Sequence, residues 1–152
     1  MNAKLTLMCG FPRCGKSTWI AKNKVDAIVV CLDVIRKHIF GHQFHREAEP
    51  FVMAVAKSMV RMLLDQDKHV IVDATNLVPV FRKEWYAIAR EYGAAIEIVW
   101  VKTPIHVCLG RNKASSRGEK LPVKVLKSMI DRFVSPSYDS EGELNINIRE
   151  II

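Results

Sequence analysis

Short apolar runs alternate along this chain with stretches in which apolar residues recur at helical spacing. Strands alternating with helices predict an α/β fold, with a mostly parallel sheet covered by helices on both faces. The expected strands span residues 5–9, 27–32, 69–72, 95–101 and 144–148. The expected helices span residues 18–22, 33–41, 49–67, 79–92, 104–111 and 122–133.

The longest expected helix, residues 49–67, carries apolar residues at helical spacing along one stripe. We interpret this stripe as core packing rather than as a groove for a ligand. Its members are Phe51, Val52, Val55, Met59, Met62 and Leu63.

Length and composition describe one ordinary domain. The chain has 152 residues, of which 49% are apolar and 26% charged. We therefore expect a single domain over residues 1–152. No apolar run approaches the roughly 20 residues that span a bilayer, and the first residues lead directly into a strand. We expect no signal peptide, no membrane partner and a cytoplasmic protein with reduced cysteines.

The strongest motif lies between the first expected strand and the first expected helix. Residues 10–17 read GFPRCGKS, which fits the phosphate-binding pattern G-x-x-x-x-G-K-[ST]. In such a loop the backbone N–H groups surround phosphates, the lysine reaches the β- and γ-phosphates, and the serine hydroxyl binds Mg²⁺. ATP and Mg²⁺ are therefore the expected ligands. The nucleotide-binding residues that we expect here are Gly10, Pro12, Arg13, Cys14, Gly15, Lys16, Ser17 and Thr18.

Two aspartates follow strands whose carboxyl ends should meet beside the phosphate loop. In open parallel sheets, ligands bind outside these strand ends. Asp73 ends the third strand and is the expected metal-supporting carboxylate, together with Ser17. Asp33 ends the second strand and is the better candidate for a general base, with Arg36 one helical turn further on. The alternative for Asp33 is the N-cap of the following helix.

Positive charge gathers near the end of the chain. The net charge is +7, and residues 111–132 contain seven basic and two acidic residues. A basic patch of this kind suits a polyanion such as nucleotide phosphates or nucleic acid, and a solvated helix face is the alternative. Residues 112–121 are expected to form a mobile lid. Arg111 and Arg117 flank or occupy this lid and could close over the phosphates, or could be surface charge only.

Taken together and in order, these motifs resemble the kinase domain of the 5′-hydroxyl polynucleotide kinases. The resemblance extends to the wider group of P-loop kinases that contains seryl-tRNA kinases and small phosphotransferases. It is carried by residues 10–12 and 15–19, by Asp33 with Arg36, by residues 73–76 with Pro79, and by Arg111-Asn112, Arg117-Gly118 and Pro122.

The resemblance implies a three-layer P-loop fold and a role for each matching residue. It makes Lys16 and Ser17 the ATP and Mg²⁺ contacts, Asp33 the general base on an acceptor 5′-OH, and Arg36 an acceptor contact. Arg117 becomes the lid arginine on the phosphates, supported by Arg111. One departure is Arg13, because this position is commonly glycine or alanine in the family. The phosphatase domain of the better-known members is absent from this sequence, so we expect phosphorylation only.

The expected activity is transfer of the ATP γ-phosphoryl group to a hydroxyl, with the 5′-OH of a polynucleotide as the leading acceptor. A small-molecule or tRNA-linked hydroxyl is the first alternative, and a nucleotide-binding module without catalysis is the second. A carboxylate paired with an arginine on the acceptor side, as Asp33 and Arg36 are, is not expected in a pure nucleotide binder. The oligomeric state does not follow from the sequence.

Overall fold

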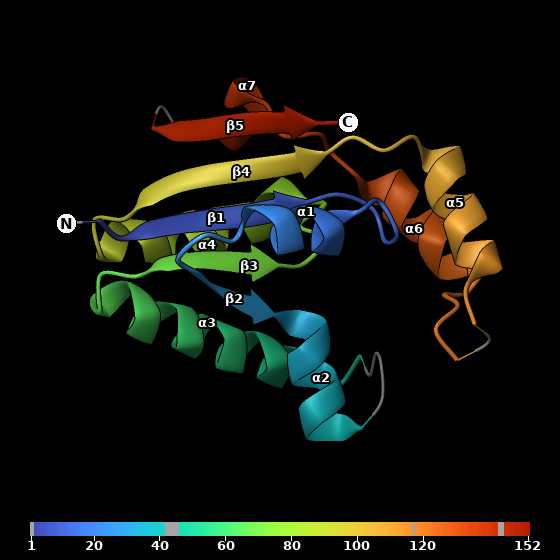
Figure 1. Ribbon diagram of the computed structural model, residues 1–152, viewed down its shortest axis with the longest axis horizontal. Helices are drawn as coiled ribbons and strands as arrows, with labels where there is room; N and C mark the ends of the chain where they lie inside the picture. The colour runs from blue at the N-terminus through green and yellow to red at the C-terminus, as the bar shows by residue number, and fades with distance from the viewer. Residues whose placement is uncertain (1, 42–45, 117, 143–144) are drawn as a thin grey trace.

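The computed structural model describes residues 2–41, 46–116, 118–142 and 145–152 (Figure 1). Its centre is a five-stranded sheet in the order β2-β3-β1-β4-β5, and every neighbouring pair is parallel. This arrangement confirms the parallel α/β fold expected from the sequence. The strands are β1 (Lys4–Cys9), β2 (Ala27–Cys31), β3 (His69–Asp73), β4 (Ala95–Val101) and β5 (Ile146–Ile151).

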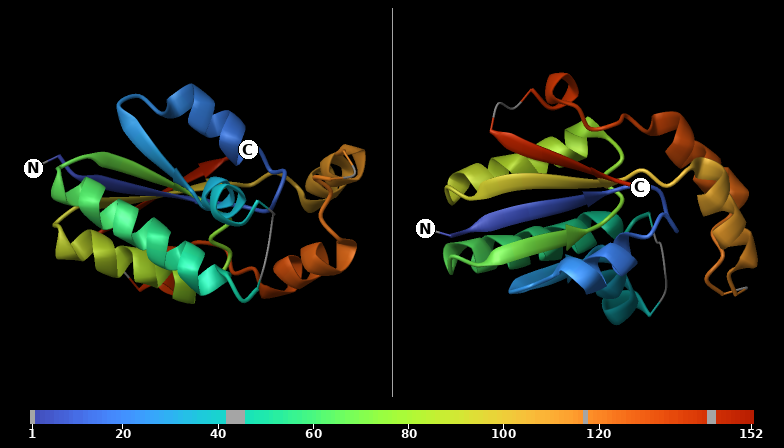
Figure 2. Two further views of the ribbon diagram at one scale, coloured as in Figure 1. Left: turned by 90° about the horizontal axis from the view of Figure 1, so that it is seen from below. Right: turned by 45° about the horizontal axis from the view of Figure 1, so that its top comes forward.

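Helices cover both faces of the sheet and also extend beyond its carboxyl edge. Helix α1 lies on one face and helices α3 and α4 lie on the other, while α5 and α6 project beyond the ends of the strands (Figure 2). Within the described residues, no helix has the length and apolar character needed to cross a bilayer. The helices are α1 (Lys16–Asn23), α2 (Leu32–Phe40), α3 (Glu49–Asp65), α4 (Pro79–Glu91), α5 (Ile105–Ala114), α6 (Val123–Arg132) and α7 (Tyr138–Glu141).

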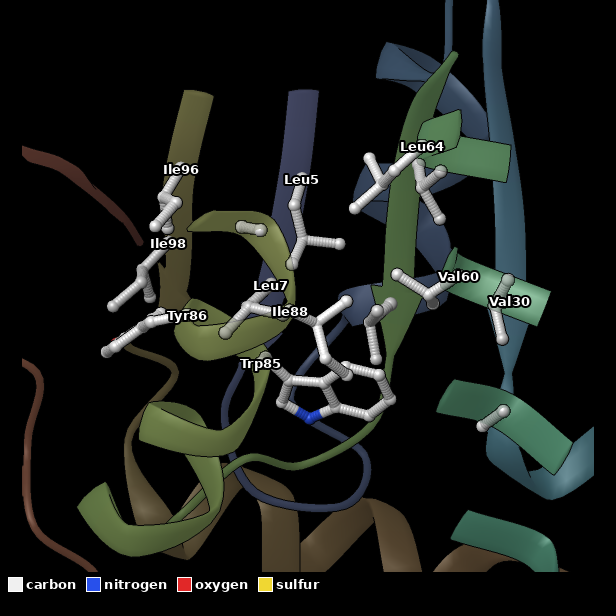
Figure 3. Packing of buried hydrophobic residues seen from close by; sticks show 14 of the residues in the cluster. Leu5, Leu7, Val30, Val60, Leu64, Trp85, Tyr86, Ile88, Ile96 and Ile98 are labelled. Atoms are coloured by element: carbon white, nitrogen blue, oxygen red, sulfur yellow. The ribbon is translucent and has the colours of Figure 1, made fainter. Parts of the chain in front are cut away.

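The larger hydrophobic core lies between the sheet and helices α3 and α4, with Trp85 and Ile88 facing Leu5 and Leu7 of β1 (Figure 3). The predicted stripe on α3 is wrong in part, because Phe51, Met59 and Met62 are exposed. A four-residue spacing sets the buried face instead, since that spacing keeps side chains on one side of a helix. The buried residues of α3 are Val52, Ala56, Val60 and Leu64.

The C-terminal part of the chain differs from the prediction in two places. The final strand was expected at residues 144–148, but β5 begins at Ile146 and continues to Ile151, where it pairs with Val101 of β4. Leu144 lies outside the described residues. The predicted loop at residues 135–142 contains the short helix α7, which begins with a capping box between Ser137 and Ser140.

Candidate active site

Two glycines give the phosphate loop its shape. Gly10 has φ +157°, and a Cβ atom there would lie 2.6 Å from Sγ of Cys14 and 3.1 Å from the carbonyl oxygen of Val101. Gly15 has φ +108° and forms the N-cap of α1. Both positions therefore favour glycine, the first because of space and both because of backbone conformation. Helix α1 begins directly after the loop, so its N-terminus points toward the position expected for phosphates.

Carbonyl groups of the loop hold the ammonium group of Lys16. Its Nζ donates to the carbonyl oxygens of Gly10 at 3.0 Å and of Phe11 at 2.9 Å, and it lies 3.7 Å from Sγ of Cys14. Cys14 itself is buried, and its carbonyl accepts a 2.5 Å hydrogen bond from the Thr103 hydroxyl. None of these hydrogen-bond partners is a carboxylate.

Three strand ends meet beside this loop, because β3 lies between β1 and β2 in the sheet. Asp73 at the end of β3 is half-buried and pairs in register with Cys31 of β2. Burial raises the pKa of Asp73. The Lys16 ammonium and a hydrogen bond from the Cys31 thiol lower that pKa, while the Asp33 carboxylate raises it. The charges of both Lys16 and Asp33 therefore affect the pKa of Asp73.

Asp33 does not cap a helix. Strand β2 ends at Cys31, which is itself the N-cap residue of α2, and Asp33 lies within the first turn of that helix. Its side chain is 90% exposed and forms an ion pair with Arg36. The N-cap alternative is therefore wrong, and the carboxylate is open to solvent at the edge of the site.

Glu49 is a member of the site that the sequence did not single out. This residue begins α3, and its two carboxylate oxygens accept hydrogen bonds from Nε of Arg36 at 2.7 and 2.9 Å. Arg36 is thus held between the carboxylates of Asp33 and Glu49. The available sequence signal was an acidic residue in the first turn of a helix, a pattern that normally indicates only a favourable helix dipole interaction.

The residues present fit a magnesium nucleotide. No group of three or more His, Cys, Asp or Glu side chains in the described ranges could bind a metal by itself. Protein sites for Mg²⁺ usually supply only one or two oxygen ligands, and substrate phosphates and water complete the octahedron. Ser17 at the exposed start of α1 and Asp73 at the end of β3 are the two oxygen donors that the sequence predicted for the metal.

Helices α5 and α6 form an arm beside the phosphate loop. Asn112 joins α5 to the segment before α6: its amide nitrogen donates to the carbonyl of Leu121 and its amide oxygen accepts from the backbone N–H of Leu121, both at 2.9 Å. Helix α5 continues to Ala114, so residues 112–114 of the predicted lid are helical. Arg111 donates from Nη1 to the carbonyl oxygen of Arg13 at 2.9 Å. Arg117 lies outside the described residues.

Behind the loop lies a buried ion pair that the sequence did not reveal. Arg82 of α4 and Glu141 of α7 are both fully buried and lie 2.6 Å apart. Nη1 of Arg82 also donates to the carbonyl oxygen of Asn76 at 2.8 Å. The Asn76 amide in turn donates to the carbonyl of Met8 in β1, also at 2.8 Å. The network therefore connects the C-terminal segment to the strand that leads into the phosphate loop.

A parallel sheet whose first strand leads through this loop into a helix defines a P-loop NTPase fold. A family model described as an AAA domain matches residues 5–136, and the chain belongs to this family. In sequence, 139 residues are 29% identical to an L-seryl-tRNA(Sec) kinase from Methanococcus maripaludis, a match that covers 87% of this chain. The match covers 53% of that kinase, so the chain spans about half the length of this curated relative.

Solved structures with this fold include several kinases. The Pnkp1/Rnl/Hen1 complex contains a chain that is 26% identical with a TM-score of 0.64, and the match covers 72% of this chain and 38% of that one. Chaetomium thermophilum Kti12 in complex with ADP-AlF3 is 15% identical with a TM-score of 0.72, covering 96% and 88% of the two chains. A gluconokinase from Sinorhizobium meliloti is 18% identical with a TM-score of 0.63, covering 99% and 83%. The last two show the fold alone.

Proposed function

We propose that this protein is an ATP-dependent kinase that transfers the γ-phosphoryl group to a hydroxyl, and that the acceptor is the 5′-OH of a polynucleotide. The phosphate loop and the family match support the kinase part of this proposal. The relative named as a seryl-tRNA kinase and the Pnkp1 complex, which is described as an RNA repair complex, support an acceptor of the nucleic-acid class.

In this proposal the phosphate loop binds the phosphates, and Asp73 at the end of β3 helps Ser17 to bind the metal. Lys16 compensates charge on the β- and γ-phosphates, and the backbone N–H groups at the start of α1 hold the remaining phosphate oxygens. Ser17 and Asp73 are the residues that would hold Mg²⁺, which neutralises phosphate charge when bound. Arg111 and Arg117 would add cations on the side of the arm.

Asp33 is the proposed general base. Its carboxylate would accept the proton of the acceptor hydroxyl as that oxygen bonds to the γ-phosphorus and ADP leaves. Arg36 is held by Glu49 and keeps the Asp33 carboxylate oriented. The 90% exposed side chain of Asp33 leaves room for an incoming hydroxyl.

One observation carries the polynucleotide acceptor: the arm presents positive charge that is not neutralised by carboxylates. Six of the seven basic residues of the 111–132 cluster are described and exposed, and none of the six forms a salt bridge with another described residue. Cations of this kind near a phosphoryl-transfer site favour a polyanionic acceptor over a neutral alcohol. The six residues are Arg111, Lys113, Lys120, Lys124, Lys127 and Arg132.

A tRNA-linked seryl hydroxyl is the second candidate, and the 29% identical seryl-tRNA kinase favours it. Tryptophan side chains, which can stack on bases, give little help in choosing, because Trp85 is buried and Trp100 packs against Phe133 with ring centroids 6.0 Å apart. The deciding experiment offers labelled ATP to 5′-OH oligonucleotides, seryl-tRNA, nucleosides and sugars in parallel. Transfer to an oligonucleotide supports the leading proposal, and transfer to none of these acceptors contradicts the kinase proposal.

Salt should weaken acceptor binding more than ATP binding. If the arm holds two or three phosphates of a single strand, the KM for the oligonucleotide should rise roughly 10-fold between about 50 and 200 mM salt. The double variant Lys124→Ala/Lys127→Ala on α6 should show a smaller salt slope, by about 1 for each phosphate that the variant no longer binds. Steady-state kinetics at several salt concentrations measures both effects. An oligonucleotide KM that does not change with salt would argue for a neutral acceptor.

The two aspartates should respond differently to replacement by asparagine. Asp33→Asn cannot accept a proton, so kcat should fall by about 10²-fold or more while ATP·Mg²⁺ binding stays close to wild type. Asp73→Asn should shift the Mg²⁺ concentration at half-maximal activity, because it removes a carboxylate that supports the metal. Titrations of Mg²⁺ and ATP for both variants distinguish the roles. A Mg²⁺ shift in Asp33→Asn but not in Asp73→Asn would mean that the two roles are exchanged.

A further inference from the structure

Arg13, at the tip of the phosphate loop, joins that loop to the α5–α6 arm through two hydrogen bonds. Its carbonyl oxygen accepts from Nη1 of Arg111 at 2.9 Å, and its own Nη2 donates to the carbonyl oxygen of Glu119 at 2.6 Å. One bond therefore reaches helix α5 and the other reaches the segment before α6. Both sides of the arm are tied to the same residue.

The backbone of Arg13 makes an arginine costly at this position. Its φ is +68°, in the left-handed region that glycine adopts freely and other L residues adopt only with strain. Backbone conformation alone would favour glycine, so the arginine must be explained by its side chain. Strain of this kind at a ligand-binding loop is a reason to look for a functional contact.

An apolar contact also joins the loop and the arm. Phe11 and Pro12 of the loop line a shallow depression together with Ile105, Cys108 and Leu126 of the arm. Apolar contacts bring the two surfaces together but do not fix the orientation of the arm relative to the loop. Hydrogen bonds depend on angle as well as distance, so they do fix that orientation. The two hydrogen bonds of Arg13 therefore fix the orientation of the arm beside the phosphate loop.

We propose that Arg13 is a positioning residue that aligns the α5–α6 arm on the phosphate loop, so that ATP binding depends on this arginine. The inference rests on the proposed kinase function for the identity of the nucleotide. Nη2 of Arg13 donates to a neutral carbonyl, so the guanidinium retains its charge beside the loop and favours an anion there. The arm also carries Arg111, which meets the loop at the carbonyl of Arg13.

The test compares Arg13→Gly with Arg13→Lys. Glycine removes the side-chain bond to Glu119 and keeps the carbonyl that accepts from Arg111. It suits the backbone conformation, so the variant should fold at least as well as wild type. Lysine retains a charged donor but lacks the forked geometry of arginine. Arg61→Ala is the matched control, since Arg61 is a partly exposed arginine paired with Glu91 between α3 and α4.

Arg13→Gly should raise the Kd and the KM for ATP·Mg²⁺ by about 5- to 20-fold, which is the range expected when a hydrogen bond to a charged, partly solvated group is removed. The acceptor KM should rise less than the ATP KM, because the basic side chains of α6 remain on the arm in this variant. Arg13→Lys should recover part of the ATP affinity, and Arg61→Ala should match wild type. Trypsin should also cleave after Lys113 and Lys120 faster in Arg13→Gly, because the arm is less firmly held.

Each contrary result has a distinct meaning. Unchanged ATP affinity and unchanged tryptic cleavage in Arg13→Gly would overturn the inference and leave the proposed function intact. A rise in the acceptor KM alone would overturn it in favour of an acceptor contact. If the wild-type protein binds ATP but transfers phosphate to no acceptor, the proposed function fails, while ATP affinity and tryptic cleavage still test Arg13.

Discussion

Lys16→Ala should reduce phosphoryl transfer by about 10²- to 10³-fold, the loss typical of removing one group that stabilises transition-state charge. In this structure the carbonyls of Gly10 and Phe11 hold the ammonium within the phosphate loop. Its removal should affect turnover more than folding, because neither bond connects Lys16 to the core. Single-turnover kinetics with labelled ATP measures the change.

Lys22→Ala is the matched control for this experiment, since Lys22 is an exposed lysine in the last turn of the same helix. It should leave turnover unchanged, which separates the local role of Lys16 from a general loss of positive charge. Circular dichroism should show wild-type folding for both variants. Near-wild-type transfer by Lys16→Ala would mean that the nucleotide does not occupy this loop as proposed.

Glu141→Ala should lower the free energy of unfolding by about 3–5 kcal/mol, which is the usual cost of leaving one buried charge without its partner. Arg82 donates to both carboxylate oxygens of Glu141, and the Tyr86 hydroxyl donates to the second of them at 2.6 Å. All three side chains are buried, so water cannot replace the lost carboxylate. A loss of this size is a large fraction of the roughly 5–15 kcal/mol typical of a folded domain. Urea denaturation measures it.

Two control variants sharpen this prediction. Glu84→Ala removes an exposed partner of Lys57 and should cost only about 0–1 kcal/mol. The double variant Arg82→Met/Glu141→Leu replaces both charges with apolar groups and should recover part of the stability that Glu141→Ala loses. If Glu141→Ala costs no more than Glu84→Ala, the buried pair does not hold the C-terminal segment in place.

The same pair should make the fold sensitive to acid. Burial alone raises the pKa of Glu141, but hydrogen bonds from Arg82 and Tyr86 outweigh burial, so the pKa of Glu141 lies below its ordinary value. A depressed pKa means that the unfolded chain binds this proton first as the pH falls. The contribution of Glu141 is therefore complete at neutral pH and is lost as the pH falls below the ordinary glutamate value toward the depressed one. Urea denaturation of the wild type and of Arg82→Met/Glu141→Leu across this pH range measures the loss.

Local patterns were sufficient for several parts of the site. The glycines of the phosphate loop, the lysine that follows the second of them and the aspartates near the ends of β2 and β3 lie next to the strands that position them, so sequence spacing identified them. Sequence also placed Arg36 one turn from Asp33, and the ion pair between them confirms that geometry. The roles of these residues stay predictions.

Local patterns failed where contacts join distant parts of the chain. Arg82 looked like one charge on an amphipathic helix, and nothing near it in sequence indicated a partner 59 residues later. The buried face of α3 was misjudged for a related reason, because apolar residues on several sides of a helix do not reveal which side the sheet covers. Asn112 likewise joins α5 to the segment before α6 through a contact nine residues away, which composition does not indicate.

The sequence by itself determined how the strands and the longer helices follow one another along the chain, the phosphate loop and the candidate acids and cations, because each depends on residues within a few positions of one another. Only the tertiary structure decided which charges are paired. In the structure Glu49 forms an ion pair with Arg36, and Glu141 forms one with Arg82. The backbone carbonyl of Glu119 accepts a hydrogen bond from Arg13, and the basic side chains of the arm are exposed. The physical reason is that the state of a charged group depends on the partners and solvent that folding brings to it, not on its neighbours along the chain.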